Sequence, residues 1–407
     1  MMRGPSSDVG EVLRERGPQM NVPRADRLDR LPPYLFAEID RMKQEALGQG
    51  ISIISLGIGD PDLPTPPHIV EVLKRTAENP AHHRYPSYQG MQTFREAVAT
   101  WYHNRFSVEL DPNSEVLSLI GSKEGLGHLP LAFLNPGEVS LIPDPAYPVY
   151  EAGTVFAGGH PVRMPLLAEN AFLPDPEDLK MSDVRQAKLL FLNYPNNPTA
   201  AVAPEGFFGQ IVDFAKEYQI IVVHDAAYSE MAFDGYQPLS FLQTPGAKEV
   251  GIELHSLSKT FNMTGWRVGF AVGNEEVLSA LGAVKTNIDS GVFQAVQEAG
   301  IAALTGDQNC VEEMRQIYGR RRDVMCEGIR SVGLQAETPR ATFYVWIRVP
   351  EGYTSASFTA HLLQRAGVMT TPGNGFGENG EGFIRAALTQ DESQIQEAIE
   401  RIRKAGF

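Results

Sequence analysis

The sequence predicts an α/β fold: a large domain with a mainly parallel central sheet, and a smaller α+β domain. Short runs rich in Val, Ile and Leu recur along the middle of the chain, most of them without two-residue alternation, and amphipathic segments separate them. Apolar runs of this kind are typical of strands that helices cover on both faces. Their alternation with helices is typical of a doubly wound sheet.

The predicted elements follow in order from residue 31. A helical pattern over 32–47 precedes a buried strand at 51–56 and a proline-rich loop at 57–67. The other apolar runs predict strands at 116–120, 139–143, 188–193, 219–225, 251–256 and 266–273. Helical periodicity predicts helices at 68–78, 93–106, 204–218, 276–285 and 311–330. The C-terminal part, with strands at 341–349 and 383–389 and helices at 357–367 and 391–405, predicts the smaller unit.

This pattern divides the chain into three parts. Residues 1–20 mix Gly, Pro, Ser and charges without a period, so we expect a disordered tail. Residues 65–299 are expected to form the large domain, and residues 21–64 with 300–407 a discontinuous small domain.

The composition excludes several classes of protein. The net charge of −15 over 407 residues argues against nucleic acid or an anionic membrane surface as the main partner. Two cysteines are too few for a disulfide framework, no run of about 18 apolar residues predicts a membrane span, and the N-terminus lacks the apolar core of a signal peptide. We therefore expect a cytoplasmic enzyme.

Polar residues follow the predicted strands, at the edge where α/β sheets bind ligands. After 116–120, Ser122 and Lys123 stand in a Gly-containing turn before a helix, which indicates a phosphate cradle; the alternative is a structural turn. After 188–193, two prolines fix the loop that carries Asn196 and Asn197, for which the alternative is an ordinary polar turn.

The next two strands end in charged residues. Asp225 closes a buried apolar strand, where a carboxylate is costly unless it meets a cation or strong donor. We interpret it as the partner of a protonated ring nitrogen; the alternative is a helix N-cap. Lys259 stands between small hydroxyl residues, where desolvation lowers the pKa of an amine as a Schiff-base lysine requires. Arg267 offers a planar fork that suits a phosphate.

In series, NYPNNPT (193–199), DAAY (225–228) and SLSKTFNMTGWRVG (256–269) resemble the fold-type I, class I/II pyridoxal-phosphate aminotransferases. The resemblance covers the chain from about residue 31. Within this family, YLF (34–36), GIGDPDLPTP (57–66), GSKEG (121–125) and HDAAYSEMAFDGY (224–236) look most like the LL-diaminopimelate aminotransferase group.

The resemblance implies pyridoxal 5′-phosphate as the cofactor. Lys259 would form a Schiff base with it and act as the base and acid of a proton shift, and Asp225 would pair with the pyridinium nitrogen. Further implied cofactor contacts are Asn197 and Tyr228 at the ring hydroxyl, Tyr147 on the ring face, and Ser122, Lys123, Ser256, Ser258 and Arg267 at the phosphate.

The resemblance also implies a substrate side and a partner. Arg385 would hold the substrate α-carboxylate by a two-point contact, with Gly59 and Tyr34 beside it. Tyr85 would reach the phosphate of the neighbouring subunit, which implies a homodimer with shared active sites.

The implied activity is ping-pong transfer of an amino group from LL-2,6-diaminopimelate to 2-oxoglutarate, in lysine biosynthesis. One departure concerns the donor: this chain has Tyr88-Gln89-Gly90 where plant-type members have a glutamate before Gln-Gly. That glutamate would help to bind the distal ammonium. The alternatives are an aminotransferase for aspartate, alanine or another amino acid, or a related fold-type I lyase.

Two other classes fit the sequence poorly. GIGDPD begins like a dinucleotide-binding fingerprint, but its third glycine is missing and Pro61 and Pro64 prevent an immediate helix. A non-enzymatic regulator with an aminotransferase-like body would need a DNA-binding module, and the N-terminal 30 residues are too short for one.

Overall fold

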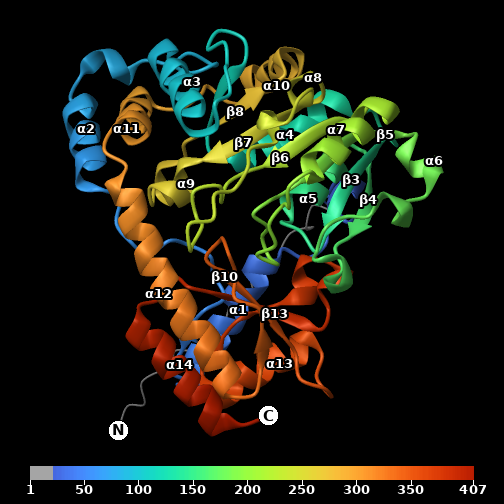
Figure 1. Cartoon of the computed structure of the whole chain (residues 1–407), viewed down its shortest axis with the longest axis vertical. Coiled ribbons are helices and arrows are strands. Elements are labelled where there is room, and N and C mark those ends of the chain that lie inside the picture. Colours follow the sequence, from blue (N-terminus) through green and yellow to red (C-terminus); the bar gives the residue numbers. More distant parts are fainter. Residues whose placement is uncertain (1–21) are drawn as a thin grey trace, which may run out of the picture.

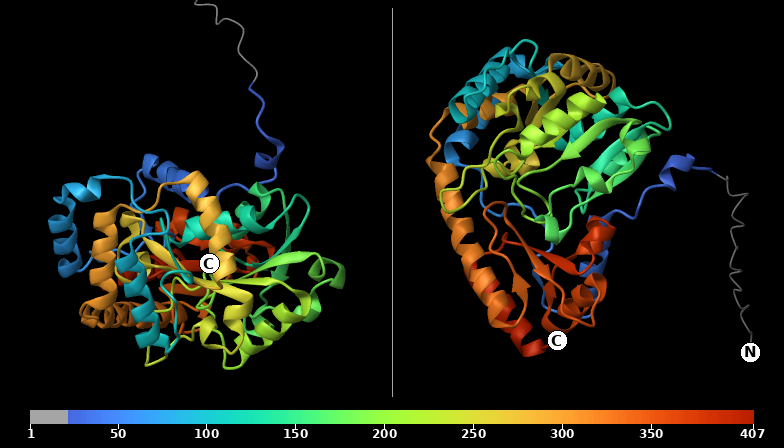
Figure 2. Two further views of the ribbon diagram at one scale, coloured as in Figure 1. Left: turned by 90° about the horizontal axis from the view of Figure 1, so that it is seen from above. Right: turned by 45° about the vertical axis from the view of Figure 1, so that its right-hand side comes forward.

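The computed structural model describes residues 22–407, so the expected tail at 1–20 lies outside the described residues. The described chain has two lobes (Figure 1). One is built on a seven-stranded sheet, and the other contains a four-stranded and a two-stranded sheet. Helix α12 runs from the first lobe along the side of the second, as Figures 1 and 2 show.

The α-helices are α1 (Leu35–Gly48), α2 (Pro67–Ala77), α3 (Gln92–Phe106), α4 (Ser122–Phe133), α5 (Val149–Phe156), α6 (Met181–Val184), α7 (Phe207–Tyr218), α8 (Ala247–Val250), α9 (Leu257–Thr260), α10 (Glu275–Ile288), α11 (Gln294–Thr305), α12 (Asn309–Ser331), α13 (Ser355–His361), continued by a π-helical turn at Leu362–Ala366, and α14 (Glu392–Ala405). The strands are β1 (Ile54–Ser55), β2 (Val116–Leu119), β3 (Val139–Asp144), β4 (His160–Pro165), β5 (Ala187–Leu192), β6 (Ile221–Asp225), β7 (Gly251–Ser256), β8 (Gly269–Gly273), β9 (Gln335–Ala336), β10 (Tyr344–Arg348), β11 (Val368–Met369), β12 (Thr371–Pro372) and β13 (Phe383–Ala387).

The seven-stranded sheet confirms the predicted mainly parallel arrangement. Its order is β2-β8-β7-β6-β5-β3-β4, and β8 alone in this sheet runs antiparallel to its neighbours. The carboxyl ends of the six other strands therefore lie at one edge, and β8 begins at that edge. This topology brings together loops that are far apart in the sequence.

The sheet differs from the prediction at three places. Strand β4 was not predicted, because its sequence HPVRMP contains two prolines and two polar residues; it lies at the sheet edge, where missing N–H donors are tolerated. The predicted strand at 51–56 shortens to β1, which pairs with β11 outside the large sheet. The predicted strand at 266–273 begins only at Gly269, because Thr264–Trp266 forms a 3₁₀ turn.

Both faces of the large sheet are buried, as the continuous apolar runs predict. On β5, Leu190 and Leu192 pack into one hydrophobic cluster with residues of α3 and α7, whereas Leu189 and Phe191 pack into a second cluster with residues of α4, α5 and α10. Successive side chains of a strand point to opposite faces, so one strand contributes to both cores.

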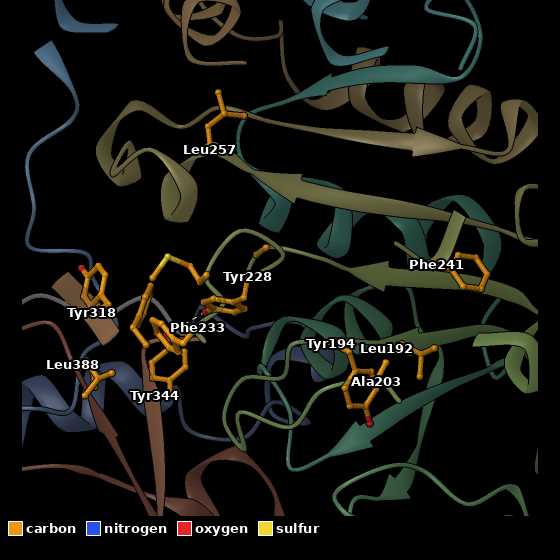
Figure 3. Close-up of a cluster of buried hydrophobic side chains, with 14 of the residues drawn as sticks. Leu192, Tyr194, Ala203, Tyr228, Phe233, Phe241, Leu257, Tyr318, Tyr344 and Leu388 are labelled. Carbon is orange, nitrogen blue, oxygen red and sulfur yellow. Dashed lines mark hydrogen bonds between the residues drawn. The ribbon is translucent and has the colours of Figure 1, made fainter. Parts of the chain in front are cut away.

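The four-stranded sheet has the order β12-β13-β10-β9, with its neighbouring strands antiparallel. Helix α1 packs against it through Leu35 and Ile39, which share a cluster with Trp346 and Phe376. The first cluster of the large sheet also continues into this lobe. Figure 3 shows Tyr228 beside Tyr344 and Phe233 at this junction. The domain boundaries at 64/65 and 299/300 stay a prediction.

Candidate active site

A cavity of about 460 Å³ lies where the strand-end loops of the large sheet meet the loop after β1 and strands β10 and β13. Twelve of the fourteen predicted site residues line it: Gly59, Ser122, Lys123, Tyr147, Asn197, Asp225, Tyr228, Ser256, Ser258, Lys259, Arg267 and Arg385. The sheet topology explains this convergence. Strands β2, β3, β5, β6 and β7 all present their carboxyl ends here.

The other two predicted residues do not line the cavity. The Tyr85 side chain is 87% exposed, so within one chain it is turned to solvent, and its role in a neighbouring subunit stays a prediction. Tyr34 is half exposed, but its hydroxyl lies 3.4 Å from the Lys123 Nζ, and this amine is 5.3 Å from the centre of the Tyr34 ring. Tyr34 therefore borders the cavity through Lys123.

Lys259 lies in the short helix α9, directly after β7. Its Nζ donates a hydrogen bond of 3.1 Å to the carbonyl oxygen of Gly59. Burial is the largest influence on this amine and lowers its pKa to about 8; Arg385 and Arg267 act in the same direction, and Asp60 opposes them. A substantial fraction of the amine is therefore neutral near pH 8, which a nucleophile or proton acceptor requires.

Asp225 ends β6 and is buried, and it is not the cap of a helix. Its Oδ2 accepts a hydrogen bond of 2.8 Å from the Tyr150 hydroxyl, whereas its Oδ1 is buried without a partner among the described residues. Burial raises the pKa of Asp225, and the bond from Tyr150 opposes that rise. The free oxygen is thus ready for an N–H donor in the cavity.

Groups that attract an anion lie around the start of α4. This helix begins at Ser122 and is long enough for its unpaired N–H groups to attract an anion. Arg267 lies beside it, with Nη2 3.3 Å from the carbonyl oxygen of Ile120. A Cβ at Gly121 would lie 2.3 Å from that Nη2, so glycine leaves room for the guanidinium.

Hydroxyl groups complete this end of the cavity. Ser256 and Ser258 flank the start of α9, and the Ser256 Oγ accepts a bond from the Ser258 N–H. The Ser258 Oγ is buried with no partner among the described residues. Lys123 belongs to the same turn, but its amine faces the rings of Tyr34 and Tyr147, at 5.3 and 5.8 Å from their centres.

Arg385 enters the cavity from β13 and is buried. Its Nη1 donates 2.7 Å to the Asn197 Oδ1 and its Nη2 donates 2.8 Å to the carbonyl oxygen of Gly57, while its Nε has no partner among the described residues. Burial lowers the pKa of this arginine, with Tyr344 and Tyr228 opposing. Because Arg385 has no carboxylate partner among residues 22–407, this buried cation favours binding of an anion.

The loop between β1 and α2 forms the wall opposite Lys259. Arg321 on α12 holds this loop through two bonds to Asp62, at 2.7 and 2.8 Å, and Tyr318 adds a third at 3.1 Å. The Thr389 hydroxyl donates to the carbonyl oxygen of Ile58. The backbone near Gly59 is therefore fixed from the small lobe.

Sequence reasoning missed five polar residues of the site. Asp60, Asn193, Thr264 and Tyr344 line the cavity, and Tyr150 lies behind Asp225. Asn193 had a signal, because it directly precedes the loop of Asn196 and Asn197, and its amide donates to the backbone oxygen of Asp225 at 2.7 Å. The two tyrosines had none, because each stands in an apolar element with the pattern of a core residue.

The residues present fit pyridoxal phosphate. Asp225 offers an unpaired buried oxygen for a pyridinium N–H, and Ser122, Arg267 and the start of α4 form a cradle for a phosphate. Lys259 lines the same cavity, and burial lowers the pKa of its amine. The cavity therefore offers a carboxylate oxygen for the ring nitrogen, N–H and hydroxyl donors for the phosphate, and an amine for the aldehyde.

Among residues 22–407, none of the helices has both the length and the apolar character needed to cross a membrane. A cluster of Glu124, His128 and Asp289 has the composition of a metal site. The buried Lys285 Nζ already bonds Glu124 at 3.0 Å and Asp289 at 2.7 Å, so a cation occupies the place of a metal.

Comparison with known proteins agrees with this geometry. Residues 51–402 match the family described as aminotransferase class I and II. An LL-diaminopimelate aminotransferase from Syntrophobacter fumaroxidans is 60% identical over 94% of this chain and 99% of its own, and one from Aquifex aeolicus is 55% identical over 93% and 98%. The substrate-bound structure of BacF from Bacillus subtilis superimposes with a TM-score of 0.90 at 41% identity, over 95% of this chain and 98% of that one. The chain therefore belongs to the class I and II aminotransferases, which are pyridoxal-phosphate-dependent enzymes of fold type I.

Proposed function

We propose that this enzyme transfers an amino group from LL-2,6-diaminopimelate to 2-oxoglutarate by a ping-pong mechanism, as a step of lysine biosynthesis in the cytoplasm. The observation that carries the proposal is the identity of 54% to 60%, over nearly the full length, with relatives named LL-diaminopimelate aminotransferase. Bound pyridoxal phosphate would supply an electron sink for charge that develops at the substrate Cα.

The residues of the chain would then bind, orient and move protons. Asp225 holds the ring nitrogen protonated, and Asn197 and Tyr228 hold the ring hydroxyl. Lys259 would take the proton from the substrate Cα and deliver it to the former aldehyde carbon of the cofactor, and would reverse this transfer with the 2-oxo acid, which its lowered pKa near 8 permits. Tyr147 covers the ring face. Ser122, Ser256, Ser258 and Arg267 hold the phosphate, with the backbone of Lys123.

Two cations suit a substrate with a carboxylate at each end. Arg385 binds the α-carboxylate, with Gly59 alongside. Among residues 22–407, the Lys123 amine contacts Tyr34 and Tyr147 and no acidic side chain, so in this proposal it binds the distal carboxylate. The predicted contact of the Lys123 side chain with the phosphate stays an untested alternative to this role.

The active unit in this proposal is a homodimer. Tyr85 and Tyr88 lie three residues apart and are both exposed, and an exposed aromatic pair suits contact with a second subunit. Tyr85 would complete the phosphate site of the partner.

The test of the substrate is a donor screen. Purified protein with pyridoxal phosphate should form glutamate from 2-oxoglutarate with LL-diaminopimelate at a kcat/KM at least tenfold above that with aspartate or alanine. Lys259→Ala should abolish turnover and keep the unfolding temperature within a few degrees. A preference for aspartate or alanine would replace the proposed donor, and normal turnover by Lys259→Ala would reject the proposed base.

The test of the shared site uses mixed dimers. Chains carrying Lys259→Ala and Tyr85→Phe are co-expressed with different tags, and the hybrid is purified through both. If Tyr85 acts across the interface, each hybrid contains one site with both native residues and regains about half of the wild-type activity of a dimer. Activity no higher than that of the Tyr85→Phe homodimer would place Tyr85 within its own site.

A further inference from the structure

Tyr344 lies between the two groups of residues that the proposed function assigns to the substrate carboxylate and to the ring hydroxyl. It stands on β10, is 2% exposed and lines the cavity. Its hydroxyl is 3.1 Å from the hydroxyl of Tyr228, which belongs to the loop after β6 (Figure 3). Among the described residues, neither of these two hydroxyls has another hydrogen-bond partner.

Each phenol has one proton, and this fixes the direction of the bond. If Tyr228 donates its proton to a molecule in the cavity, it can receive from Tyr344 but cannot donate to it. Tyr344 must then donate to the Tyr228 oxygen. A hydroxyl that accepts such a bond becomes a stronger donor itself, because hydrogen bonds in a chain polarise one another.

The place of the Tyr344 hydroxyl is set by the backbone opposite. A Cβ on Gly59 would lie 2.0 Å from this oxygen, so a side chain at position 59 would collide with it. The carbonyl oxygen of Gly59 accepts the bond from Lys259. Glycine thus lets the Tyr344 hydroxyl lie close to the loop that faces the lysine.

The ring of Tyr344 has a second contact. The Arg385 guanidinium lies 4.1 Å from its centre, and 4.7 Å from that of Phe376. Arg385 also donates to Asn197. The small sheet therefore contacts both residues proposed for the ring hydroxyl, Asn197 through Arg385 and Tyr228 through Tyr344.

We propose that Tyr344 is a positioning residue of this enzyme: its hydroxyl donates to Tyr228 and aims the Tyr228 proton at the ring hydroxyl of the cofactor, while its ring supports Arg385. The inference rests on the proposed role of Tyr228. The charged and titratable groups that face Tyr228 are Tyr344 from β10, Arg385 from β13, Asp225 from β6 and Tyr150 from α5. Of these two tyrosines, Tyr344 is the one whose hydroxyl bonds Tyr228, so Tyr344→Phe removes that bond while both charges stay in place.

The measurable consequence is a shift in the pH dependence of the bound cofactor. Donation to the ring hydroxyl stabilises its ionised form, which lowers the pH at which the linked lysine nitrogen loses its proton. Tyr344→Phe weakens this donation and should raise the pH midpoint of the cofactor absorbance by about half a unit, as loss of a net hydrogen bond predicts. The kcat should fall by about threefold to tenfold, with KM for the amino donor changed less than about twofold, because the ring under Arg385 remains.

Three further variants separate the outcomes. Tyr228→Phe should shift the midpoint in the same direction and further. Gly59→Ala should shift it at least as far as Tyr344→Phe does, since its Cβ would collide with the hydroxyl and with the adjoining ring carbons of Tyr344 and displace them together. Tyr102→Phe, which removes a buried tyrosine hydroxyl that bonds Glu253 outside the cavity residues, should lower the unfolding temperature without moving the midpoint.

The results decide between the proposals. A shift by Tyr228→Phe without one by Tyr344→Phe, in folded protein, would overturn the role of Tyr344 and leave Tyr228 in place. No shift by either variant would reject the assigned role of Tyr228, and that of Tyr344 with it. If Tyr344→Phe fails to fold, Gly59→Ala decides: an unchanged midpoint in that variant overturns the inference.

Discussion

The Tyr150 hydroxyl donates a 2.8 Å hydrogen bond to Oδ2 of Asp225, and Oδ1 of the same carboxylate has no partner among the described residues. Tyr150 is fully buried in α5 and stacks on Phe191, with ring centres 5.1 Å apart. The tyrosine therefore occupies one oxygen from behind and leaves the other for the cavity. In the proposed mode of cofactor binding, this arrangement would orient the carboxylate toward the ring nitrogen.

Tyr150→Phe should keep the stacking and lose this bond. Because donation by Tyr150 holds down the pKa of Asp225 against burial, its removal should raise that pKa. A hydrogen bond to a charged group contributes about 1.5–3 kcal/mol, so we expect the acid limb of the kcat profile to move up by about one pH unit, with kcat about tenfold lower.

The measurement is the pH dependence of kcat in the holoenzyme between the acid limb and neutrality. Tyr353→Phe is the control, because its hydroxyl lies 3.5 Å from the His361 ring, outside the cavity residues. An acid limb that is unchanged in Tyr150→Phe would show that Asp225 does not depend on this bond.

Lys259 should determine how quickly the cofactor-free protein takes up pyridoxal phosphate. Only the neutral amine attacks an aldehyde, and burial lowers the pKa of Lys259 from 10.5 to about 8. The uptake rate should rise with pH and level off above about pH 8, which stopped-flow absorbance can follow. A rate that continues to climb to pH 10 would indicate an ordinary, solvated lysine.

Arg385→Lys should show that the planar guanidinium matters beyond its charge. Arginine reaches Asn197 and Gly57 through two nitrogens and lies over the Tyr344 ring, whereas an ammonium is a point charge without this geometry. Loss of a charged hydrogen bond predicts a kcat/KM about 10- to 100-fold lower. Arg365→Lys, at an exposed arginine, should change it less than about twofold. Equal values for the two variants would contradict the role of Arg385.

The sequence predicted the residues that follow strands, and it missed those whose importance depends on a distant partner. Asp225 and Lys259 were found because charges at the ends of buried apolar strands need an explanation. Tyr150 and Tyr344 stand within apolar elements, and their partners are 75 and 116 residues away. Only the folded chain brings these hydroxyls to Asp225 and Tyr228, so the residues next to each tyrosine in the sequence do not indicate the contact.

The strands of the fold, like the site residues, could be predicted where the local sequence reflects burial. Continuous apolar runs predicted six of the seven strands of the large sheet, because two buried faces demand apolar residues in succession. The edge strand β4 has only one neighbour and keeps prolines and polar residues, so its sequence shows no such run. The candidate site could be predicted without β4, because the side chains of the site come from the ends of other strands.

A buried carboxylate on β7 supports the sheet beneath this site. Glu253 is fully buried and accepts bonds from the Ser240 hydroxyl at 2.8 Å, the Phe241 N–H at 2.7 Å and the Tyr102 hydroxyl at 3.0 Å, and His255 lies 2.8 Å away. Burial would raise the pKa of Glu253, but the hydrogen bonds and charges of His224, 3.3 Å away, and His255 hold it far below the ordinary 4.5. The ionised form is thus the one the fold stabilises.

Glu253→Gln should therefore destabilise the protein by about 3–5 kcal/mol at pH 7, as loss of a paired buried charge predicts. A carboxyl with a depressed folded-state pKa contributes stability above its unfolded value of 4.5 and loses it as the pH falls further. The stability difference between wild type and variant should be full at pH 7 and smaller at pH 3.5. Urea unfolding at both pH values measures it, with Glu249→Gln, an exposed position, as the control. A difference that is equal at the two pH values would mean that Glu253 is not ionised in the native protein.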